Sequence, residues 1–182
     1  MKYDKQWLLK AANKEDLDYL FFYGHKADPS GKITSSCFSQ WWPVPFVVDG
    51  VTYETAGHWM MAQKALVFDD QEMYEAIIAA SSPAKAKKLG RQVRNFNDDA
   101  WKAHRSKIVV QGNMHKFSQN TVIKKFLLST GNSVLVEASR FDKIWGIGLA
   151  LDDHRANDPR KWNGLNLLGF ALMEVRDVLS HE

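Results

Sequence analysis

The sequence predicts a mainly α-helical chain of the α+β class, with a small β-hairpin and short strands around a ligand pocket. Apolar residues recur at helical spacing through much of the chain after residue 54, which is the pattern of amphipathic helices. The pair Asp49-Gly50 stands between two β-prone runs, as in a tight hairpin. No linker rich in proline, glycine or serine divides the 182 residues, so a single domain over 1–182 is expected.

The first part of the chain combines a charged helix with short β segments. Residues 1–20 have the pattern of a short charged helix, with Asn13 as a candidate cap for a second turn. The segment 21–24 (FFYG) reads as a short buried strand or turn. A proline- and glycine-punctuated loop at 25–36 follows. The hairpin then covers 46–53.

Helices dominate the middle of the chain. Thr55 can cap the first of them, and Ser82-Pro83 is a start signal for another because proline suits the first helical position. Asn97, followed by two aspartates, should open the longest helix. The expected helices are 55–68, 70–80, a short one from Pro83, one from about 97 to Phe117, and 119–129.

The longest helix has two candidate faces. Its apolar stripe is expected at Ala100, Ala103, Val110, Met114 and Phe117. A second face carries Trp101, His104, Arg105 and Ile108.

The last third should contain a strand, a long loop and a final helix. Residues 133–138 alternate like a strand, and 139–165 are polar and glycine-punctuated. Loops of this length in compact domains are usually functional or disordered. The final helix is expected to dock on the core through Leu168, Ala171, Leu172, Val175, Val178 and Leu179.

Composition limits the class of protein. With 45% hydrophobic and 25% charged residues, the chain resembles an ordinary globular protein, and a net charge of +3 is too small to indicate nucleic-acid or membrane binding by itself. Cys37 is the lone cysteine, so no intrachain disulfide forms and a reducing cytosol is expected. The N-terminal residues lack a continuous apolar stretch, which argues against a signal peptide or membrane span. We therefore expect a cytoplasmic protein.

Four polar clusters remain after the core stripes are removed. They lie at 38–42, at the start of the helix at 55, at 140–148 and at 161–166. Three of them carry tryptophan, whose face suits stacking on a base or flavin-like ring. Two carry glycine near asparagine or aspartate, and the amides of glycine-rich turns suit phosphates. Together they predict a pocket for a nucleotide-like ligand.

Each of these features also has a plain structural interpretation. Gly146-Ile147-Gly148 is an isolated GxG outside a βαβ unit, so a turn is favoured over a phosphate cradle. Trp145 and Trp162 are more often loop anchors than stacking platforms. Asp142 is the most interesting acid, although a loop aspartate is usually a turn former.

Charged residues and histidines have similar alternatives. Arg91 and Arg94 suit phosphate, but a solvated helix end is favoured. Lys64 shares a helix face with position 57, and the alternative is a surface lysine with a buried stem. His58 and His104 are more often hydrogen-bonded structural histidines than ligands or bases. The histidine spacing does not suit a metal site.

Several blocks taken together resemble the NADAR (YbiA-like) family. These are FFYG, CFSQWWPVPFVVDGVTYETAGHWMMAQKA, SSPAKAKKLGR, the stretch from Asn97 to Arg105, KFSQN, LLSTGNSVLVEASRFDKIWGIG and WNGLNLLGFALMEVR, in the family's order. The likeness covers about residues 19–180 and leaves 1–18 as an N-terminal helical extension. It is much more specific than any single motif.

The resemblance implies an N-glycosidase linked to NAD and ADP-ribose metabolism, with no metal and no redox cofactor. Some members of the family cleave phosphorylated riboflavin-pathway intermediates, and others remove ADP-ribose from modified guanine in nucleic acid. We favour ADP-ribosylated guanine as the substrate here. The alternative from another class is a non-enzymatic module that binds ADP-ribose or a related nucleotide. In both cases the expected partner is a nucleic acid or a nucleotide-like small molecule, and no membrane partner is expected.

The family's pattern at the start of the helix at 55 resembles T-[AS]-E-H-[YW], with a glutamate regarded as catalytic. In this sequence that glutamate falls on Gly57. Glycine in a first helical turn costs about 1 kcal/mol relative to alanine. Two explanations are open: a natural member that has lost or relocated its activity, or a chain altered to silence catalysis. The second is favoured because every other block is intact and glycine serves no evident backbone need.

The resemblance also assigns roles to other residues. Asp142 is expected to act as acid or base or to hold ribose hydroxyls, Trp101 to stack on the leaving base, and Lys64 to contact the sugar or a phosphate. Gln40 stands where the family commonly has asparagine, so its contact geometry differs. The residues matched to the substrate pocket are Tyr23, Ser39, Gln40, Trp41, His58, Arg91, Trp145, Gly146, Gly148, Asn163 and Asn166.

Overall fold

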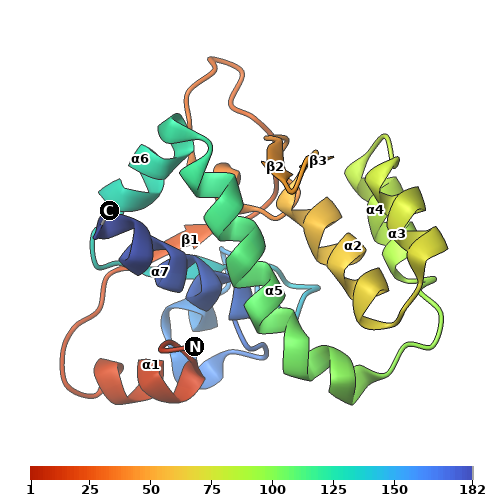
Figure 1. Cartoon of the computed structure of the whole chain (residues 1–182). Coiled ribbons are helices and arrows are strands. Elements are labelled where there is room, and N and C mark those ends of the chain that lie inside the picture. The colour runs from red at the N-terminus through yellow and green to blue at the C-terminus, as the bar shows by residue number, and fades with distance from the viewer. Residues whose placement is uncertain (182) are drawn as a thin grey trace. The chain divides into compact units, whose positions relative to one another are not determined.

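The computed structural model describes residues 1–181 and has an α+β fold dominated by helices, as the sequence predicts (Figure 1). These residues divide into two compact units. The terminal unit comprises Met1–Ser39 and the chain from Val122 onward, and the central unit comprises Gln40–Thr121. None of the helices within the described range is both long and apolar enough to cross a bilayer.

Seven α-helices and four short strands make up the regular structure of residues 1–181. The terminal unit contains α1 (Lys5–Ala12), β1 (Tyr19–Phe22), α6 (Thr121–Ser129, from its second residue on), β4 (Val134–Glu137) and α7 (Leu167–Ser180). The central unit contains β2 (Phe46–Val48), β3 (Val51–Tyr53), α2 (Ala56–Val67), α3 (Gln71–Ile78), α4 (Pro83–Gly90) and α5 (Asp98–Ser118). Three 3-10 turns, Ser35–Phe38, His154–Asn157 and Pro159–Lys161, lie in the terminal unit.

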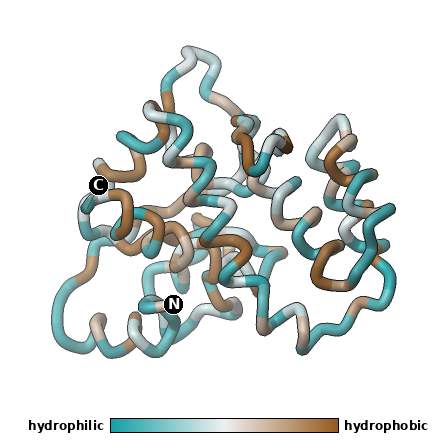
Figure 2. The backbone as a smooth tube through the Cα atoms, in the orientation of Figure 1, coloured by the Kyte–Doolittle hydropathy of each residue, from teal (hydrophilic) through white to brown (hydrophobic). Residues whose placement is uncertain are grey.

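The terminal unit is built on a parallel pair of strands, β1 and β4. Tyr19 aligns with Val134 and Phe22 with Glu137, and α7 packs on β4. This pairing places the first strand two residues earlier than the expected 21–24 segment, because the ladder to β4 starts at Tyr19. In Figure 2 the first turns of α7 are mainly brown, whereas α1 is mostly teal.

The cap and stripe assigned to the two terminal helices need correction at two positions. Asp4 caps the N-terminus of α1 by accepting from Trp7 N, and Asn13 is its C-cap rather than the cap of a second turn. In α7 the predicted stripe is buried except at Val178, which is 51% exposed. Val178 therefore lies off the docking face, which continues to Leu179 at 2% exposure.

The central unit begins with the predicted hairpin, in which β2 pairs with β3 antiparallel. Asp49 and Gly50 both have positive φ, at 50° and 77°, as a two-residue type I′ turn requires. Thr55, Asp70, Ser82 and Asn97 then cap α2, α3, α4 and α5 through their side chains. The helix starts predicted from cap residues are confirmed to within one or two positions.

The buried face of α5 differs from the predicted stripe. In the predicted stripe Phe117 is buried, but Ala103 is exposed and Val110 and Met114 are half-buried. On the second face Trp101, Arg105 and Ile108 are buried, and His104 is exposed. The reason is the packing of α2 against α5. Trp59 of α2 donates from Nε1 to Ile108 O at 2.9 Å. A Cβ on Gly112 would come within 2.4 Å of Trp59 Cδ1, so the indole fits only where α5 has glycine.

Candidate active site

The predicted site residues fall into clusters within each unit. In the central unit, Gln40, Trp41, Gly57 and His58 gather at the start of α2, a group we call the α2 opening. Lys64 and Trp101 lie together farther along α2 and α5. In the terminal unit the predicted residues of 142–166 form one segment, which we call the Asp142–Asn166 loop.

The start of α2 is held by two hydrogen bonds to its first amides. Thr55 Oγ1 accepts from His58 N at 3.2 Å, and Gln40 O accepts from Gly57 N at 2.7 Å. Both amides at this positive helix end are therefore used within the protein. A carboxylate on residue 57 would lie beside the remaining helix dipole, which favours its ionised form.

The indole of Trp41 occupies the space that a side chain on residue 57 would need. A Cβ built on Gly57 would lie 2.3 Å from both Cε3 and Cζ3 of Trp41. Any side chain here requires the ring to move, since real Cβ atoms do not approach so closely. Gly57 does not have a positive φ, so the backbone conformation does not require glycine. What glycine provides is room for Trp41, whose ring lies directly on the helix backbone.

His58 is a hydrogen-bonded structural histidine, as its plain interpretation predicts. Its Nε2 lies 3.1 Å from Ala80 O, which can only accept, so Nε2 carries the proton. Nδ1 then accepts from Thr55 Oγ1 at 2.8 Å. Burial lowers the pKa of His58, partly opposed by the Ala80 carbonyl, so the neutral ring is favoured. A substrate contact by His58 stays a prediction.

Gln40 is the last member of a hydrogen-bond chain that runs through the Asn113 side chain to the Val109 carbonyl, and the donor and acceptor of each bond can be assigned. Asn113 Nδ2 donates to Val109 O at 2.8 Å, which leaves Asn113 Oδ1 to accept from Gln40 Nε2 at 3.3 Å. Gln40 is only 5% exposed, and its Oε1 has no hydrogen-bond partner among residues 1–181. Buried acceptors are normally paired, so this oxygen is suited to a donor from a ligand or water.

Lys64 and Trp101 lie near each other on α2 and α5. Lys64 Nζ donates to Gly90 O at 2.7 Å, and lies 4.2 Å from the ring centroid of Phe96 and 6.0 Å from that of Trp101. Burial lowers the pKa of Lys64, so it is more than a solvated surface lysine. Arg91, next to Gly90, is exposed, which agrees with a solvated helix end.

Sequence reasoning placed Arg105 on a secondary face of α5 and gave it no role. The structure makes it one of the most buried charged residues, at 9% exposure. The signal that was available is its spacing of four residues from Trp101 and three from Ile108, which puts the three on one helix face.

In the terminal unit, Asp142 forms the turn that its plain interpretation predicts. Asp142 Oδ1 accepts from Ile144 N at 2.9 Å and from Trp145 N at 2.8 Å, while Asp142 N donates to Ser139 Oγ. These bonds fix the backbone that presents half-buried Trp145. A further role as acid or base stays a prediction.

The glycines of the same loop pack backbone against backbone. A Cβ on Gly164 would lie 2.3 Å from Gly146 O, and Gly148 has a φ of +66°. The amides of Ile147 and Gly148 donate to Glu137 O and Asp142 O, at 3.0 and 3.1 Å. With these donors used internally, a plain turn is favoured over a phosphate cradle.

Asn166 joins this loop to β4. Its Oδ1 accepts from Glu137 N at 3.0 Å and its Nδ2 donates to Leu135 O at 2.9 Å, while Asn166 N donates to Gly146 O. Asn166 has no exposed surface, and Asn163 is exposed. Trp162 is buried and donates to Ala156 O, so it anchors the loop as predicted.

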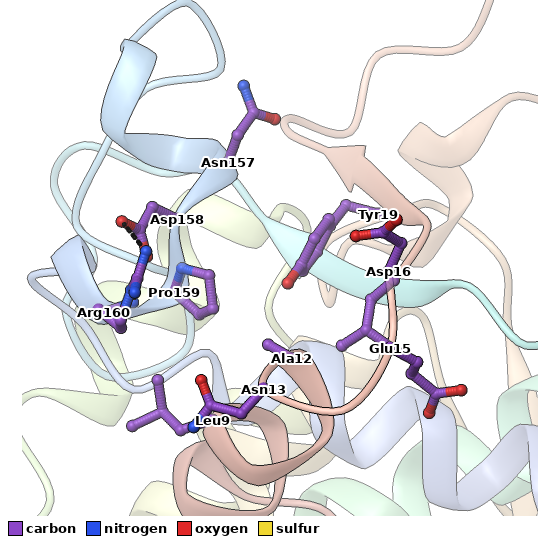
Figure 3. Close-up of a pocket in the computed structure, with 11 residues that line it drawn as sticks. Leu9, Ala12, Asn13, Glu15, Asp16, Tyr19, Asn157, Asp158, Pro159 and Arg160 are labelled. Carbon is purple, nitrogen blue, oxygen red and sulfur yellow. Dashed lines mark hydrogen bonds and ion pairs between the residues drawn. The ribbon is translucent and has the colours of Figure 1, made fainter.

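The terminal unit also contains hollows, one of which is lined by a predicted site residue. Tyr23 is 58% exposed and lines one of about 410 Å³ with Arg140 and Leu151. Buried Ser39 follows the 3-10 turn that ends at Phe38. The second hollow, of about 310 Å³, lies between the end of α1 and the turn at Pro159 (Figure 3). It holds no predicted site residue, and its Asp158 is paired with Arg160.

The chain is similar in sequence and in fold to known proteins of one family. The NADAR domain profile matches residues 21–180. The chain is 45% identical over 164 residues to N-glycosidase R617 of Acanthamoeba polyphaga mimivirus, covering 87% of this chain and 95% of that protein. It is 32% identical over 147 residues to N-glycosidase YbiA of Escherichia coli (strain K12), covering 81% of each. The NMR structure of the E. coli protein YbiA superposes with a TM-score of 0.66 at 27% identity, over 92% of this chain and 89% of that chain.

Proposed function

This chain belongs to the NADAR domain family, and on that premise we propose that it is built to cleave a ribose C1–N bond as an N-glycosidase. The substrate class that we favour is ADP-ribosylated guanine in nucleic acid. In this chain Gly57 impairs the reaction, because the position that carries the family's glutamate lacks a carboxylate. The protein should therefore bind its ligand and turn it over slowly.

The observation that carries the glycosidase proposal is the 45% identity to N-glycosidase R617, and the contact between Trp41 and Gly57 carries the proposed impairment. The indole covers the backbone at the start of α2, at the position where the resemblance puts the catalytic group. Breaking a ribosyl C1–N bond develops positive charge on C1 and the ring oxygen, as in glycoside hydrolysis. A carboxylate at residue 57 would stabilise that charge and orient the attacking water.

The test restores the carboxylate and separates its charge from its size. Gly57→Glu should cleave ADP-ribosylated guanine nucleotide at least about tenfold faster than the present chain, since losing one such electrostatic group commonly costs about 100- to 1000-fold. Gly57→Gln is the matched control, because it displaces Trp41 equally and adds no charge. Release of guanine is followed by chromatography.

Equal rates for Gly57→Glu and Gly57→Gln would contradict the catalytic assignment of position 57. The same assay with a phosphorylated riboflavin-pathway intermediate tests the second substrate class. If Gly57→Glu cleaves that compound faster than it cleaves ADP-ribosylated guanine, the riboflavin-pathway intermediate is the better substrate and the favoured substrate class is wrong.

A non-enzymatic binding module is the second candidate function. It is favoured by one feature, the aromatic ring that fills the place of the missing carboxylate. The module predicts that both the present chain and Gly57→Glu bind ADP-ribose and that neither releases guanine.

A further inference from the structure

The side chain of Arg105 is largely buried, and its guanidinium has no partner among residues 1–181. Its side chain lies on α5 in the central unit at 9% exposure. No hydrogen bond or ion pair joins its guanidinium to any of residues 1–181. The other buried arginine, Arg176, is 5% exposed and donates to Thr130 Oγ1 and Ser133 O, both at 2.8 Å. Arg176 is therefore tied to two acceptors within its own unit, whereas Arg105 has no acceptor among residues 1–181.

The guanidinium of Arg105 is the part of this side chain that reaches solvent. None of its nitrogens is among the fully buried side-chain atoms that lack a partner within residues 1–181, so a ligand from solution can approach it. Other arginines have carboxylate partners within the chain, as in Arg94 with Asp70 and Arg155 with Asp153. Arg105 has none among residues 1–181, so its donors are available to an anionic ligand.

The position of Arg105 is set by the packing of α2 on α5. On α5, Trp101, Arg105, Ile108 and Gly112 follow one another at spacings of four, three and four residues, which is one helix face. Trp59 of α2 contacts this face at Ile108 and Gly112, and Lys64 of α2 lies near Trp101. Arg105 therefore lies at a level between the two contacts.

The charge around this position is positive. Lys64 donates only to the Gly90 carbonyl and has no carboxylate partner among residues 1–181. Lys102, one turn from Arg105, pairs with the exposed Asp98 and Asp99. Neither Lys64 nor Arg105 has a carboxylate partner among residues 1–181, and two such cations on facing helices favour an anion.

We infer that Arg105 is the anchor for a phosphate group of the ribosyl ligand. A guanidinium presents two parallel N–H donors that match phosphate oxygens, and it stays charged at any physiological pH. The ribosyl identity of the ligand rests on the proposed function, whereas the phosphate contact rests on Arg105 alone. Arg91, the earlier candidate for phosphate, is exposed and ranks below it.

The test compares Arg105→Met with Lys107→Met, which removes the same charge from an exposed position two residues along α5. Calorimetric titration with ADP-ribose should show at least about a tenfold loss of affinity for Arg105→Met and less than about a twofold loss for Lys107→Met. Arg105→Lys keeps the charge and loses the paired donors, so its affinity for ADP-ribose should be intermediate between those of Arg105→Met and Lys107→Met. Equal affinity of Arg105→Met and Lys107→Met would overturn the inference.

Thermal unfolding without ligand separates binding from structure. Arg105→Met should melt at about the same temperature as the present chain, because the guanidinium has no hydrogen bond or ion pair within residues 1–181 and methionine keeps an apolar stem at the buried part of the side chain. A clear drop in melting temperature would show a structural role and overturn the inference. Inorganic pyrophosphate is the second probe: if it binds as tightly as ADP-ribose, the ribosyl part is overturned and the site is one for free phosphate.

The affinity of Arg105→Met for ADP-ribose tests the phosphate contact separately from the proposed cleavage reaction. If Gly57→Glu releases no guanine but Arg105→Met still loses ADP-ribose affinity, the proposed reaction fails and the phosphate anchor stands.

Discussion

The α2 opening and the Asp142–Asn166 loop differ in how completely their polar groups are paired: both contain groups bonded within the protein, such as His58, but the α2 opening also has a buried oxygen without a partner. In the loop, the Asp142 carboxylate and the Asn166 amide all bond to backbone groups of the same unit. At the α2 opening, Gln40 Oε1 has no partner within residues 1–181, and on α5 Arg105 has none either. Both regions carry glycine and tryptophan, so their sequences look alike. What distinguishes them is whether buried polar groups are already paired.

This difference assigns the two regions different roles. A paired polar group holds the chain in shape, and removing it costs stability. An unpaired buried group costs stability as it stands, and is retained where a ligand completes it. We therefore expect mutations in the loop to act mainly on stability and mutations near the α2 opening to act mainly on ligand affinity.

The largest expected effect is that of Asn166→Ala in the loop. It leaves the buried Glu137 N–H and Leu135 C=O without partners, at about 1–3 kcal/mol each, so unfolding by urea should show about 2–5 kcal/mol of destabilisation. Asn163→Ala is the control, because Asn163 is exposed, and should stay within about 0.5 kcal/mol. Similar values for the two variants would contradict the role given to the loop.

A smaller effect is expected at Asp142. Asp142→Ala removes the acceptor for two backbone amides and should destabilise the chain by about 1–2 kcal/mol. Asp142→Asn keeps an oxygen at that place, so it should recover most of the loss in the same urea experiment. If Asp142→Ala were as stable as the present chain, the Asp142 carboxylate would not be needed for the turn, which would contradict its structural role.

On the other side of the comparison, Gln40→Met should change affinity more than stability. The variant removes the acceptor that a ligand would use, which is worth about 1 kcal/mol or roughly fivefold in the dissociation constant of ADP-ribose. It removes the unpaired oxygen of Gln40 but also takes away the donor to buried Asn113 Oδ1, so one unpaired buried oxygen replaces another and the melting temperature should change little. Lower stability with unchanged affinity would place Gln40 with the paired groups of the loop.

The smallest expected effect is a pH dependence from His58. Burial lowers its pKa in the folded chain, so below about 6.5 the unfolded chain binds a proton that the folded chain does not. Stability should therefore fall as pH drops through that value. His58→Gln should flatten the fall in melting temperature between about pH 7.5 and 5.5; an unchanged slope would show that other groups cause it.

Local signals in the sequence located most of the fold. Side-chain caps such as Thr55 and Ser82 and the Asp49-Gly50 turn act within a few residues, so their elements could be predicted. The parallel pairing of β1 with β4 depends on segments far apart in the chain, and periodicity carries no trace of it. The face of α5 was misassigned because Gly112, counted as neither apolar nor polar, admits Trp59.

For the candidate site, residue types could be predicted but not their hydrogen-bond partners. The turn role of Asp142 and the structural role of His58 followed from general frequencies, and both are seen. The open oxygen of Gln40 depends on the direction of the amide chain through Asn113, which only coordinates reveal. Arg105 was passed over because an arginine on a long helix is usually solvated.

The most direct test is a crystal structure of this chain with ADP-ribose. The account predicts the ribose beside the backbone of Gly57 at the start of α2, with the Trp41 ring moved off its present contact and a phosphate on Arg105. A nucleotide bound away from α2, with Trp41 still lying on Gly57 and Arg105 without a ligand, would contradict it.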